Sequence, residues 1–177
     1  MKKKTALITG VSGQDGAYLA NFLLKKNYKV IGSDRRNSRD SGWRLDYLNL
    51  KERIILEDLD ICEITNIIRI FDKYNFDEVY NLAAQSFVQS SFFNPTTTVN
   101  VTALGALNLL EIIKTKNKKI KFYQASSSEM FGNPSSNISG FLNEKSEFNP
   151  QSPYAVSKVF AHHMTRNYRV AYNMFAT

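Results

Sequence analysis

The sequence predicts an α/β protein with a doubly wound parallel sheet, the Rossmann fold. Two observations carry this prediction. Short apolar runs of strand length alternate along the chain with segments of helical periodicity, and a glycine-rich loop joins the first such run to the first helical segment. With 177 residues, 43% of them hydrophobic, the chain is long enough for one domain with a sizeable core.

The first half of the chain contains three expected strands and two expected helices. Ala6–Thr9 is a short apolar run, residues 14–26 have helical spacing, and Tyr28–Gly32 is again strand-like. The next apolar run, Arg53–Leu56, precedes helical periodicity from 61 to 74. We expect these segments to form β-α-β units, which place their strands parallel to one another.

The second half continues the alternation. Glu78–Leu82 is expected to be a strand, residues 94–116 a long helix, and Ile120–Gln124 another strand. Residues 133–151 are rich in proline, glycine, serine and asparagine, which favours a surface excursion. A last helix is expected from Ser152-Pro153 to about residue 173, because serine caps a helix and proline suits its first turn.

Charge and cysteine content restrict the class of protein. The net charge is +7, but the lysines are scattered and no aromatic and basic pattern indicates nucleic acid, so we expect a solvated basic surface that also suits a nucleotide cofactor and an anionic substrate. The single cysteine, Cys62, excludes an intrachain disulfide and favours a cytoplasmic location. The apolar run after Lys2–Lys4 is too short for a signal peptide, and we expect no membrane span.

The glycine-rich loop is the candidate cofactor site. It consists of Gly10, Val11, Ser12, Gly13, Gln14, Asp15 and Gly16. Glycine permits a tight turn and the close approach of phosphate, while a helix N-terminus offers free N–H groups and partial positive charge to a diphosphate. The loop therefore predicts dinucleotide binding, and an ordinary tight turn is the alternative.

Asp34, Arg35 and Arg36, at the end of the expected second strand, bear on the choice of cofactor. An acid there binds the ribose hydroxyls of NAD, whereas arginine accommodates the 2′-phosphate of NADP. The two adjacent arginines favour NADP, since arginine forms bidentate phosphate contacts. The alternative is that both arginines face solvent and Asp34 binds the ribose.

Tyr154 and Lys158 form the candidate reaction centre. Residues four apart share one helix face, so the lysine ammonium can favour the ionised phenol of the tyrosine. Such a base removes a hydroxyl proton while hydride leaves the same carbon for a nicotinamide. Ser127 and Glu129 are expected to supply the remaining polar groups. The alternatives are simple packing for Tyr154, an ordinary exposed helix lysine for Lys158 and a surface salt bridge for Glu129.

Several motifs together resemble a known family. They are Thr9–Gly16, Arg35-Arg36, Asn81–Ser86, Phe122–Glu129 and the Tyr-x-x-x-Lys pair. The chain resembles the extended short-chain dehydrogenases that act on nucleotide sugars, and within them the GDP-mannose 4,6-dehydratase family. This resemblance extends over essentially all 177 residues. It implies a lyase that binds NADP and GDP-mannose, with residues 1–177 as an NADP-binding domain that carries the catalytic residues.

The resemblance also implies roles. Tyr154 takes the proton of the sugar C4 hydroxyl, to which Ser127 is hydrogen-bonded, while C4 gives hydride to NADP. Glu129 then removes the C5 proton and assists loss of the C6 hydroxyl as water, and hydride returns to C6, giving GDP-4-dehydro-6-deoxy-mannose. Two alternatives remain: another extended short-chain dehydrogenase acting on a GDP-sugar, such as a reductase or epimerase, and a noncatalytic NADP-binding fragment.

Further positions match the family's cofactor contacts. Asp60 and Ile61 would contact the adenine, although Asp60 alternatively caps the helix that follows it. The segment Leu82, Ala83, Ala84, Gln85 and Ser86 would line the cofactor, with Ser86 also near the sugar, and Thr97 is a further contact or a surface threonine. Asn100 is expected to tie strands together, and His162 and His163 to occupy core or interface positions without a metal.

The C-terminus is where the sequence departs from the family. The family continues into a smaller domain that binds the guanosine diphosphate, so we expect the fold to be truncated before that domain, with Phe175–Thr177 as the start of a further strand. We therefore expect weak NADP binding and little turnover. Uncovered apolar faces are expected to promote homo-oligomerisation.

Overall fold

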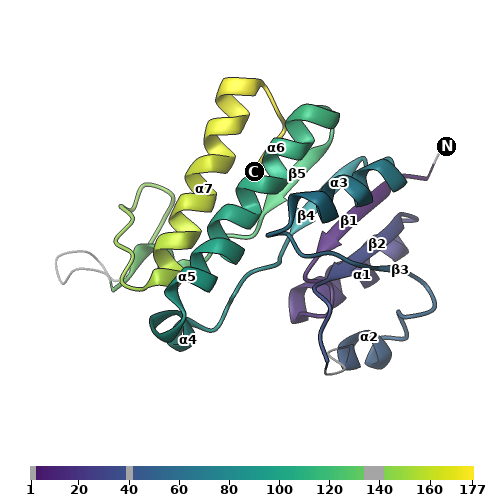
Figure 1. Cartoon of the computed structure of the whole chain (residues 1–177), viewed down its shortest axis with the longest axis horizontal. Coiled ribbons are helices and arrows are strands. Elements are labelled where there is room, and N and C mark those ends of the chain that lie inside the picture. Colours follow the sequence, from purple (N-terminus) through teal and green to yellow (C-terminus); the bar gives the residue numbers. More distant parts are fainter. Residues whose placement is uncertain (1–2, 39–41, 134–141) are drawn as a thin grey trace.

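Five parallel strands form a single sheet in the order β3-β2-β1-β4-β5. The structure is a computed structural model that describes residues 3–38, 42–133 and 142–177, so part of the expected surface excursion lies outside it. The strands, labelled in Figure 1, are β1 (Thr5–Thr9), β2 (Lys29–Asp34), β3 (Ile55–Asp58), β4 (Glu78–Asn81) and β5 (Lys121–Gln124). The crossover between β1 and β4 is the topological switch of a Rossmann fold, which confirms the predicted fold class.

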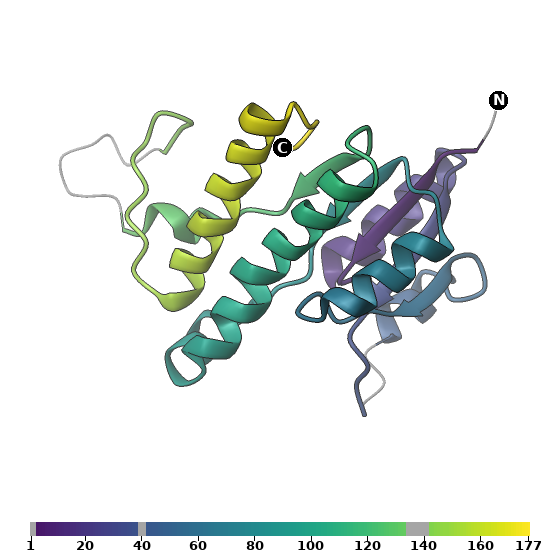
Figure 2. The same ribbon diagram turned by 45° about the horizontal axis from the view of Figure 1, so that its top comes forward.

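The helices connect these strands. They are α1 (Gln14–Lys25), α2 (Trp43–Tyr47), α3 (Ile64–Lys73), α4 (Val88–Phe93), α5 (Pro95–Thr98), the π-helical segment η1 (Val99–Leu104), α6 (Gly105–Lys116), the 3-10 turn η2 (Ser128–Phe131) and α7 (Pro153–Tyr172). The last two long helices, α6 and α7, lie side by side (Figure 2).

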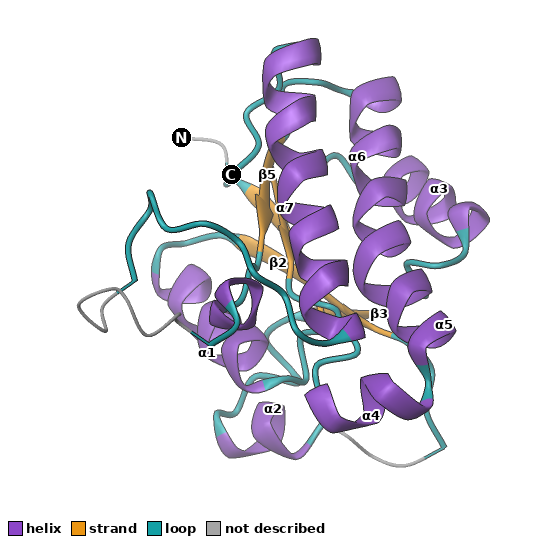
Figure 3. Ribbon diagram, turned by 90° about the vertical axis from the view of Figure 1, so that its left-hand side faces the viewer, coloured by secondary structure: helices purple, strands orange, loops and turns teal. Residues whose placement is uncertain are grey.

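Both faces of the sheet are covered, and each carries a core (Figure 3). Ala6 and Ile8 of β1 face the smaller core, which α1 and α2 complete, whereas Leu7 faces the larger core beneath α3, α6 and α7. All three side chains are fully buried. This continuous apolar strand, with no polar alternation, is what a central parallel strand requires.

The sequence-based boundaries differ from the structure at several elements. The expected helix 94–116 is α5, η1 and α6 in succession, with a π-helical interruption, and α2 and α4 were not predicted. The third strand lies two residues later than expected, and α3 begins at Ile64 instead of residue 61. At the C-terminus, Phe122 and Ala176 form a parallel bridge, so Phe175–Thr177 pairs with β5 as expected.

The helical segment 95–116 has the length and hydropathy of a membrane span, with 22 residues and a mean hydropathy of 1.2. Half of it is buried within the fold, where Leu109, Leu110 and Ile113 are fully enclosed in the larger core. A core helix of a globular domain passes the same test, so we interpret it as such a helix.

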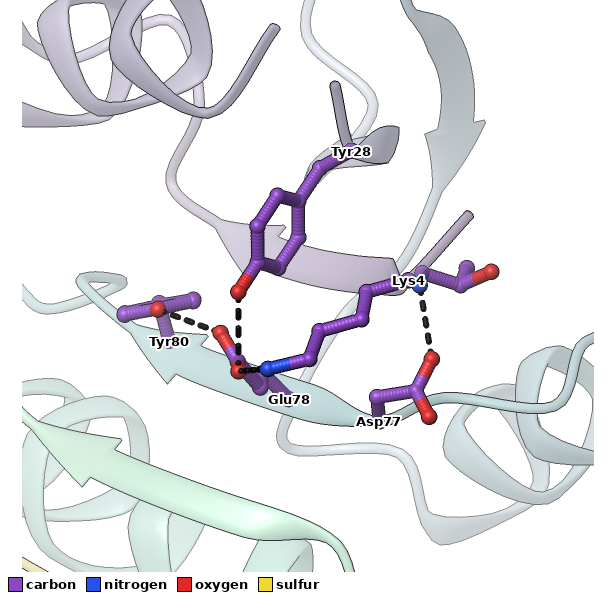
Figure 4. Close-up of polar contacts among 6 residues, drawn as sticks. Lys4, Tyr28, Asp77, Glu78 and Tyr80 are labelled. Atoms are coloured by element: carbon purple, nitrogen blue, oxygen red, sulfur yellow. Dashed lines mark hydrogen bonds and ion pairs between the residues drawn. The ribbon is translucent and has the colours of Figure 1, made fainter. Parts of the chain in front are cut away.

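A cluster of polar side chains around Glu78 lies at the amino-terminal ends of the strands (Figure 4). Its carboxylate accepts hydrogen bonds from the hydroxyls of Tyr28 and Tyr80, at 3.0 and 2.7 Å, and from Lys4 Nζ at 3.3 Å. Beside it, Asp77 accepts from the N–H of Thr5 at 2.8 Å. These contacts lie at the opposite end of the strands from the glycine loop and join β1 and β4.

Candidate functional site

The glycine loop adopts a backbone that only glycine allows at two positions. Gly10 has a φ of +70°, and a Cβ there would lie 3.0 Å from the backbone nitrogen of Ala83. A Cβ on Gly16 would lie 2.4 Å from the carbonyl oxygen of Gly10, so this glycine lets α1 pack directly against the loop. Gly13 is the N-cap residue of α1 and provides no side-chain cap. The first turn of α1 therefore remains open to an anion.

Four loop N–H groups are already used within the fold. Gly10 and Val11 donate to the carbonyl of Ser33 at 2.8 and 3.3 Å, Ser12 to the carboxylate of Asp34 at 2.9 Å, and Gly13 to the carbonyl of Gly10 at 3.1 Å. The Val11 side chain is fully buried in the smaller core. The remaining predicted loop residues, Gln14, Asp15 and Gly16, form the first turn of α1, where N–H groups have no intrahelical acceptor.

A cleft of about 370 Å³ opens at the carboxyl ends of β1, β2 and β4. It brings together most of the residues predicted to bind the cofactor. They are Gly10, Ser12, Gly13, Arg35, Asp60, Ile61, Leu82, Ala83, Ala84, Gln85, Ser86 and Thr97. This is the crevice in which open α/β sheets bind their ligands.

Arg36 lies in a second, adjoining hollow that shares Ser12, Asp34 and Arg35 with the cleft. The cleft and the adjoining hollow thus form one continuous surface, and the two arginines lie at its outer end. Between them and the glycine loop, the Asp34 carboxylate is partly buried. Burial raises the pKa of this carboxyl, and the hydrogen bond from Ser12 opposes that change.

Asp60 has a local structural role in addition to its place in the cleft. Its side chain accepts from the N–H of Cys62 at 2.9 Å, and its carbonyl accepts from the N–H of Glu63 at 3.1 Å. The N-cap residue of α3 is Glu63, so Asp60 closes the preceding turn and does not cap the helix. Helix capping, the alternative to an adenine contact for Asp60, is therefore not its role.

The segment after β4 is held by the helix that follows it. The N–H of Gln85 donates to the hydroxyl of Thr102 at 3.1 Å, and its side-chain oxygen accepts from Thr98 at 3.2 Å. Its side-chain nitrogen donates to the carbonyl of Phe87 at 3.0 Å. Gln85 therefore fixes one wall of the cleft against α5 and η1.

Tyr154 and Lys158 lie in the first two turns of α7. Ser152 caps this helix by accepting from the N–H of Ala155 at 3.0 Å, and Pro153 occupies the first position, as predicted. The tyrosine and lysine side chains are 7% and 3% exposed, and Lys158 Nζ lies 5.8 Å from the centre of the Tyr154 ring.

Lys158 joins α7 to the loop after β5. Its Nζ atom donates to the carbonyl oxygen of Ala125 at 2.8 Å. Burial lowers the pKa of Lys158 to about 8, because the charged form is removed from water. The lysine is therefore poised to change its protonation near neutral pH.

Ser127 and Glu129 lie in the same loop. The Ser127 hydroxyl caps η2 by accepting from the N–H of Glu129 at 3.2 Å, and Met130 anchors the turn in the interior. Glu129 is exposed. The four predicted catalytic residues thus come from η2 and the start of α7, two elements in contact, but none of them lines the 370 Å³ cleft.

Sequence reasoning missed a buried polar group at the carboxyl ends of three strands. Thr9, Asn81 and Gln124 end β1, β4 and β5 and are hydrogen-bonded to one another in that order. Asn100, which was expected to tie strands together, is exposed in η1, so that expectation was wrong. The available signal was a polar residue at the last position of each of three strands.

The two histidines of α7 form an aromatic cluster beside this loop. The ring of Phe148 meets those of His162 and His163 edge-on, at 5.1 and 5.5 Å between centres. His162 Nδ1 lies 3.5 Å from the hydroxyl of Ser126. Burial, followed by the charges of His163 and two arginines, lowers the pKa of His162. His162 is thus half-buried against Phe148, whereas His163 touches the same ring but is exposed and does not lie in the core.

The sheet order, the glycine loop and the buried Tyr-x-x-x-Lys pair are those of a short-chain dehydrogenase. A family model described as GDP-mannose 4,6 dehydratase matches residues 7–177. The chain belongs to this GDP-mannose 4,6-dehydratase family.

Individual relatives agree with this membership. The GDP-mannose 4,6-dehydratase of Vibrio cholerae serotype O1 is 45% identical over 99% of the chain, and the GDP-mannose 4,6 dehydratase 1 of Arabidopsis thaliana is 44% identical over 98%. The chain spans 48% and 50% of these two proteins, about half their length. Among solved structures, a Brucella ovis UDP-glucose 4-epimerase in complex with NAD shares the fold with a TM-score of 0.82 at 23% identity, covering 97% of the chain and 49% of that protein.

Proposed function

We propose that this chain is the NADP-binding, catalytic part of a GDP-mannose 4,6-dehydratase. One observation carries the proposal beyond family membership. Helix α7 presents Tyr154 and Lys158, both buried, beside the loop that carries Ser127 and Glu129, and Lys158 is bonded to that loop. A base and a second proton carrier thus lie on adjoining elements, as a reaction that both oxidises and eliminates requires.

In the proposed reaction, Tyr154 accepts the proton of the C4 hydroxyl of GDP-mannose while Ser127 holds that hydroxyl. A nicotinamide bound in the cleft would supply the acceptor for the C4 hydride and its later donor to C6. Glu129 takes the C5 proton, which the C4 ketone has made acidic, and protonates the departing C6 hydroxyl. Glu129 is exposed at η2, so its carboxylate is accessible to a substrate that approaches from solvent. An oxidation alone would not need this carboxylate.

We propose NADP as the cofactor. Arg35 lines the cleft and Arg36 lines the hollow that adjoins it, and guanidinium groups suit the 2′-phosphate. The carboxylate of Asp34 is engaged by the N–H of Ser12, which leaves it less available to bind both ribose hydroxyls. Titration with NADP and NAD tests this choice. Arg35→Ala and Arg36→Ala should each weaken NADP binding and leave NAD binding little changed. Weaker NAD binding with unchanged NADP binding would favour NAD as the cofactor.

We propose that the guanosine diphosphate is bound largely by a second domain, since the relatives are about twice as long. The 177-residue chain is then expected to bind NADP weakly and to turn over GDP-mannose poorly. Exposed apolar side chains on α4 and α7, among them Phe93 and Val156, support the proposal of a homo-oligomer, which light scattering would test. The single free cysteine supports a cytoplasmic location.

The reaction is tested by incubating excess chain with NADP and GDP-mannose and measuring product mass. A product lighter by one water, even at trace yield, supports the dehydratase. A sugar of unchanged mass but altered configuration would indicate an epimerase, and NADP binding without any product would indicate a noncatalytic module. Glu129→Gln should stop the reaction after oxidation, so that reduced cofactor accumulates, whereas the exposed Glu144→Gln control should behave as the parent chain.

A further inference from the structure

A directional chain of buried hydrogen bonds connects β1 to the loop after β5. The Thr9 hydroxyl donates to Asn81 Oδ1 at 2.7 Å, and Asn81 Nδ2 donates to Gln124 Oε1 at 2.8 Å. Gln124 Nε2 then donates to the carbonyl oxygen of Ala125 at 3.0 Å. The three side chains are only 1%, 1% and 4% exposed, so water does not compete for these bonds.

Both ends of this series of hydrogen bonds are backbone groups, and the carbonyl end determines its direction. Thr9 Oγ1 accepts from the N–H of Ala83 at 3.2 Å, which leaves its own proton for Asn81. At the other end a carbonyl can only accept, so the Gln124 amide must present its nitrogen to Ala125. Neither amide can be reversed without leaving a buried group unpaired.

The Ala125 carbonyl, which is the last acceptor in this series of hydrogen bonds, also binds Lys158. The Ala125 carbonyl oxygen receives Gln124 Nε2 at 3.0 Å and Lys158 Nζ at 2.8 Å. A carbonyl has two lone pairs, and here both have a donor. Gln124 is thereby tied to the orientation of the peptide group that binds the lysine ammonium, at the start of the loop that continues to Ser127 and Glu129.

We propose that Gln124 is a positioning residue for Lys158, acting through the Ala125 carbonyl. The catalytic significance of this role rests on the proposed function, but the positioning itself does not. Lys158 is 3% exposed, and its ammonium depends on protein acceptors in place of water. Fixing the carbonyl stabilises the charged lysine beside the Tyr154 ring. The same chain of bonds begins at Thr9, directly before the glycine loop, and so links the cofactor end of the site to its reactive end.

Two substitutions at Gln124 have opposite expected effects on Lys158. Gln124→Met keeps the length of the side chain but removes both polar groups, so the carbonyl loses its fixed orientation and the charged lysine loses stabilisation. The titration midpoint of Lys158 should fall by roughly half a pH unit or more. Gln124→Glu still accepts from Asn81 but places a carboxylate beside the ammonium, and the midpoint should rise by about one pH unit.

The titration is read by NMR from the 15Nζ and 13Cε resonances of Lys158 in the cofactor-free 177-residue chain, assigned with Lys158→Met. Because no substrate or cofactor is present, the result is independent of whether the chain is a dehydratase. Thr165→Val is the matched control. It removes a buried hydroxyl of α7 that donates to the carbonyl of Ala161, and it should leave the titration midpoint of Lys158 unchanged.

Opposite shifts in the two Gln124 variants support positioning. Unchanged midpoints, or shifts of the same sign, would overturn it, since a residue that merely ties strands together would alter thermal stability alone. If Gln124→Met does not fold, Gln124→Asn takes its place, because the shorter side chain keeps the amide but withdraws its nitrogen from the Ala125 carbonyl; an unshifted midpoint there contradicts the proposal.

Discussion

The Asp34 carboxylate accepts a hydrogen bond from the backbone N–H of Ser12 at 2.9 Å. The end of β2 therefore holds the glycine loop in place, in addition to lining the cofactor cleft. An acid at this position is usually read as a ribose ligand. Here one of its oxygens already accepts a hydrogen bond within the fold, which is why we propose the adjacent arginines as the groups that meet the phosphate of NADP.

Asp34→Asn should strengthen NADP binding. The amide oxygen can still accept from Ser12, while the negative charge beside the proposed 2′-phosphate position is removed. We expect NADP affinity to increase roughly two- to tenfold and NAD affinity to stay level or decrease. Isothermal titration calorimetry with both cofactors measures the change.

The matched variant Asp34→Ala removes the acceptor together with the charge. It should lose stability relative to Asp34→Asn, since the N–H of Ser12 is left without its partner. Weaker NADP binding in Asp34→Asn would show that the carboxylate itself contacts the cofactor, and would contradict our assignment.

Gly16→Ala should destabilise the fold through a direct clash. The added Cβ would lie 2.4 Å from the Gly10 carbonyl oxygen and 2.7 Å from the Cα of Val11, both rigid backbone atoms. We expect a loss of about 1–3 kcal/mol in the free energy of unfolding, measured by urea denaturation. Gly13→Ala is the control, because its nearest contact is a milder 3.2 Å and its φ of −66° suits alanine. Equal losses in the two variants would show that steric contact is not the cause.

Acid should destabilise the chain partly through Glu78. Burial raises the pKa of this carboxyl, but hydrogen bonds from the two tyrosines and Lys4 outweigh burial and hold the pKa below its ordinary value (Figure 4). Because the folded state holds the proton less tightly than the unfolded chain, stability is present above pH 4.5 and is lost as pH falls through the depressed pKa.

Glu78→Gln removes this dependence and should flatten the acid limb of a stability curve measured by urea denaturation below about pH 5. It should also lower stability at neutral pH, because an amide nitrogen would face hydroxyl donors. The exposed Glu144→Gln serves as control. An acid limb as steep as that of the parent chain would assign the effect to other carboxylates.

The strands and long helices were predictable because their apolar pattern is set by burial. Ala6–Thr9 is apolar without alternation since both faces of β1 are covered, and Ser152-Pro153 begins α7 through chemistry confined to adjacent residues. The π-helical η1 was not predictable in this way. It follows Thr98, which bonds the carbonyl of Asn94, and precedes Gly105, where a Cβ would lie 2.5 Å from Ile61. That contact exists only once distant segments pack.

The candidate site likewise has residues that could be predicted from the sequence and residues whose roles could not. The glycine-loop residues of the cleft were found from their motif, because the chemistry of diphosphate binding fixes residue types at short spacing, whereas Asp60, Ile61, Leu82–Ser86 and Thr97 were expected there from the family resemblance alone. The second role of Asp34 could not be found, since it depends on β1 and β2 lying in register with Thr9 opposite Ser33. Likewise, Gln124 reaches Asn81 only because β4 and β5 pair with these two residues opposite each other.

Lys158 should make the chain more stable as the solution becomes alkaline. Burial lowers the pKa of this lysine to about 8 from its ordinary 10.5, so between these values the unfolded chain binds more protons than the folded one. Stability therefore rises with pH across this window and is level below it as far as this group is concerned.

Lys158→Met should abolish the rise and stabilise the fold at pH 7, since an apolar side chain of similar length replaces a buried ammonium. Urea unfolding at a series of pH values measures both effects, with Lys118→Met, at an exposed position, as control. A parent chain whose stability stays flat above pH 8 would mean that the Ala125 carbonyl compensates fully for the loss of water around Lys158.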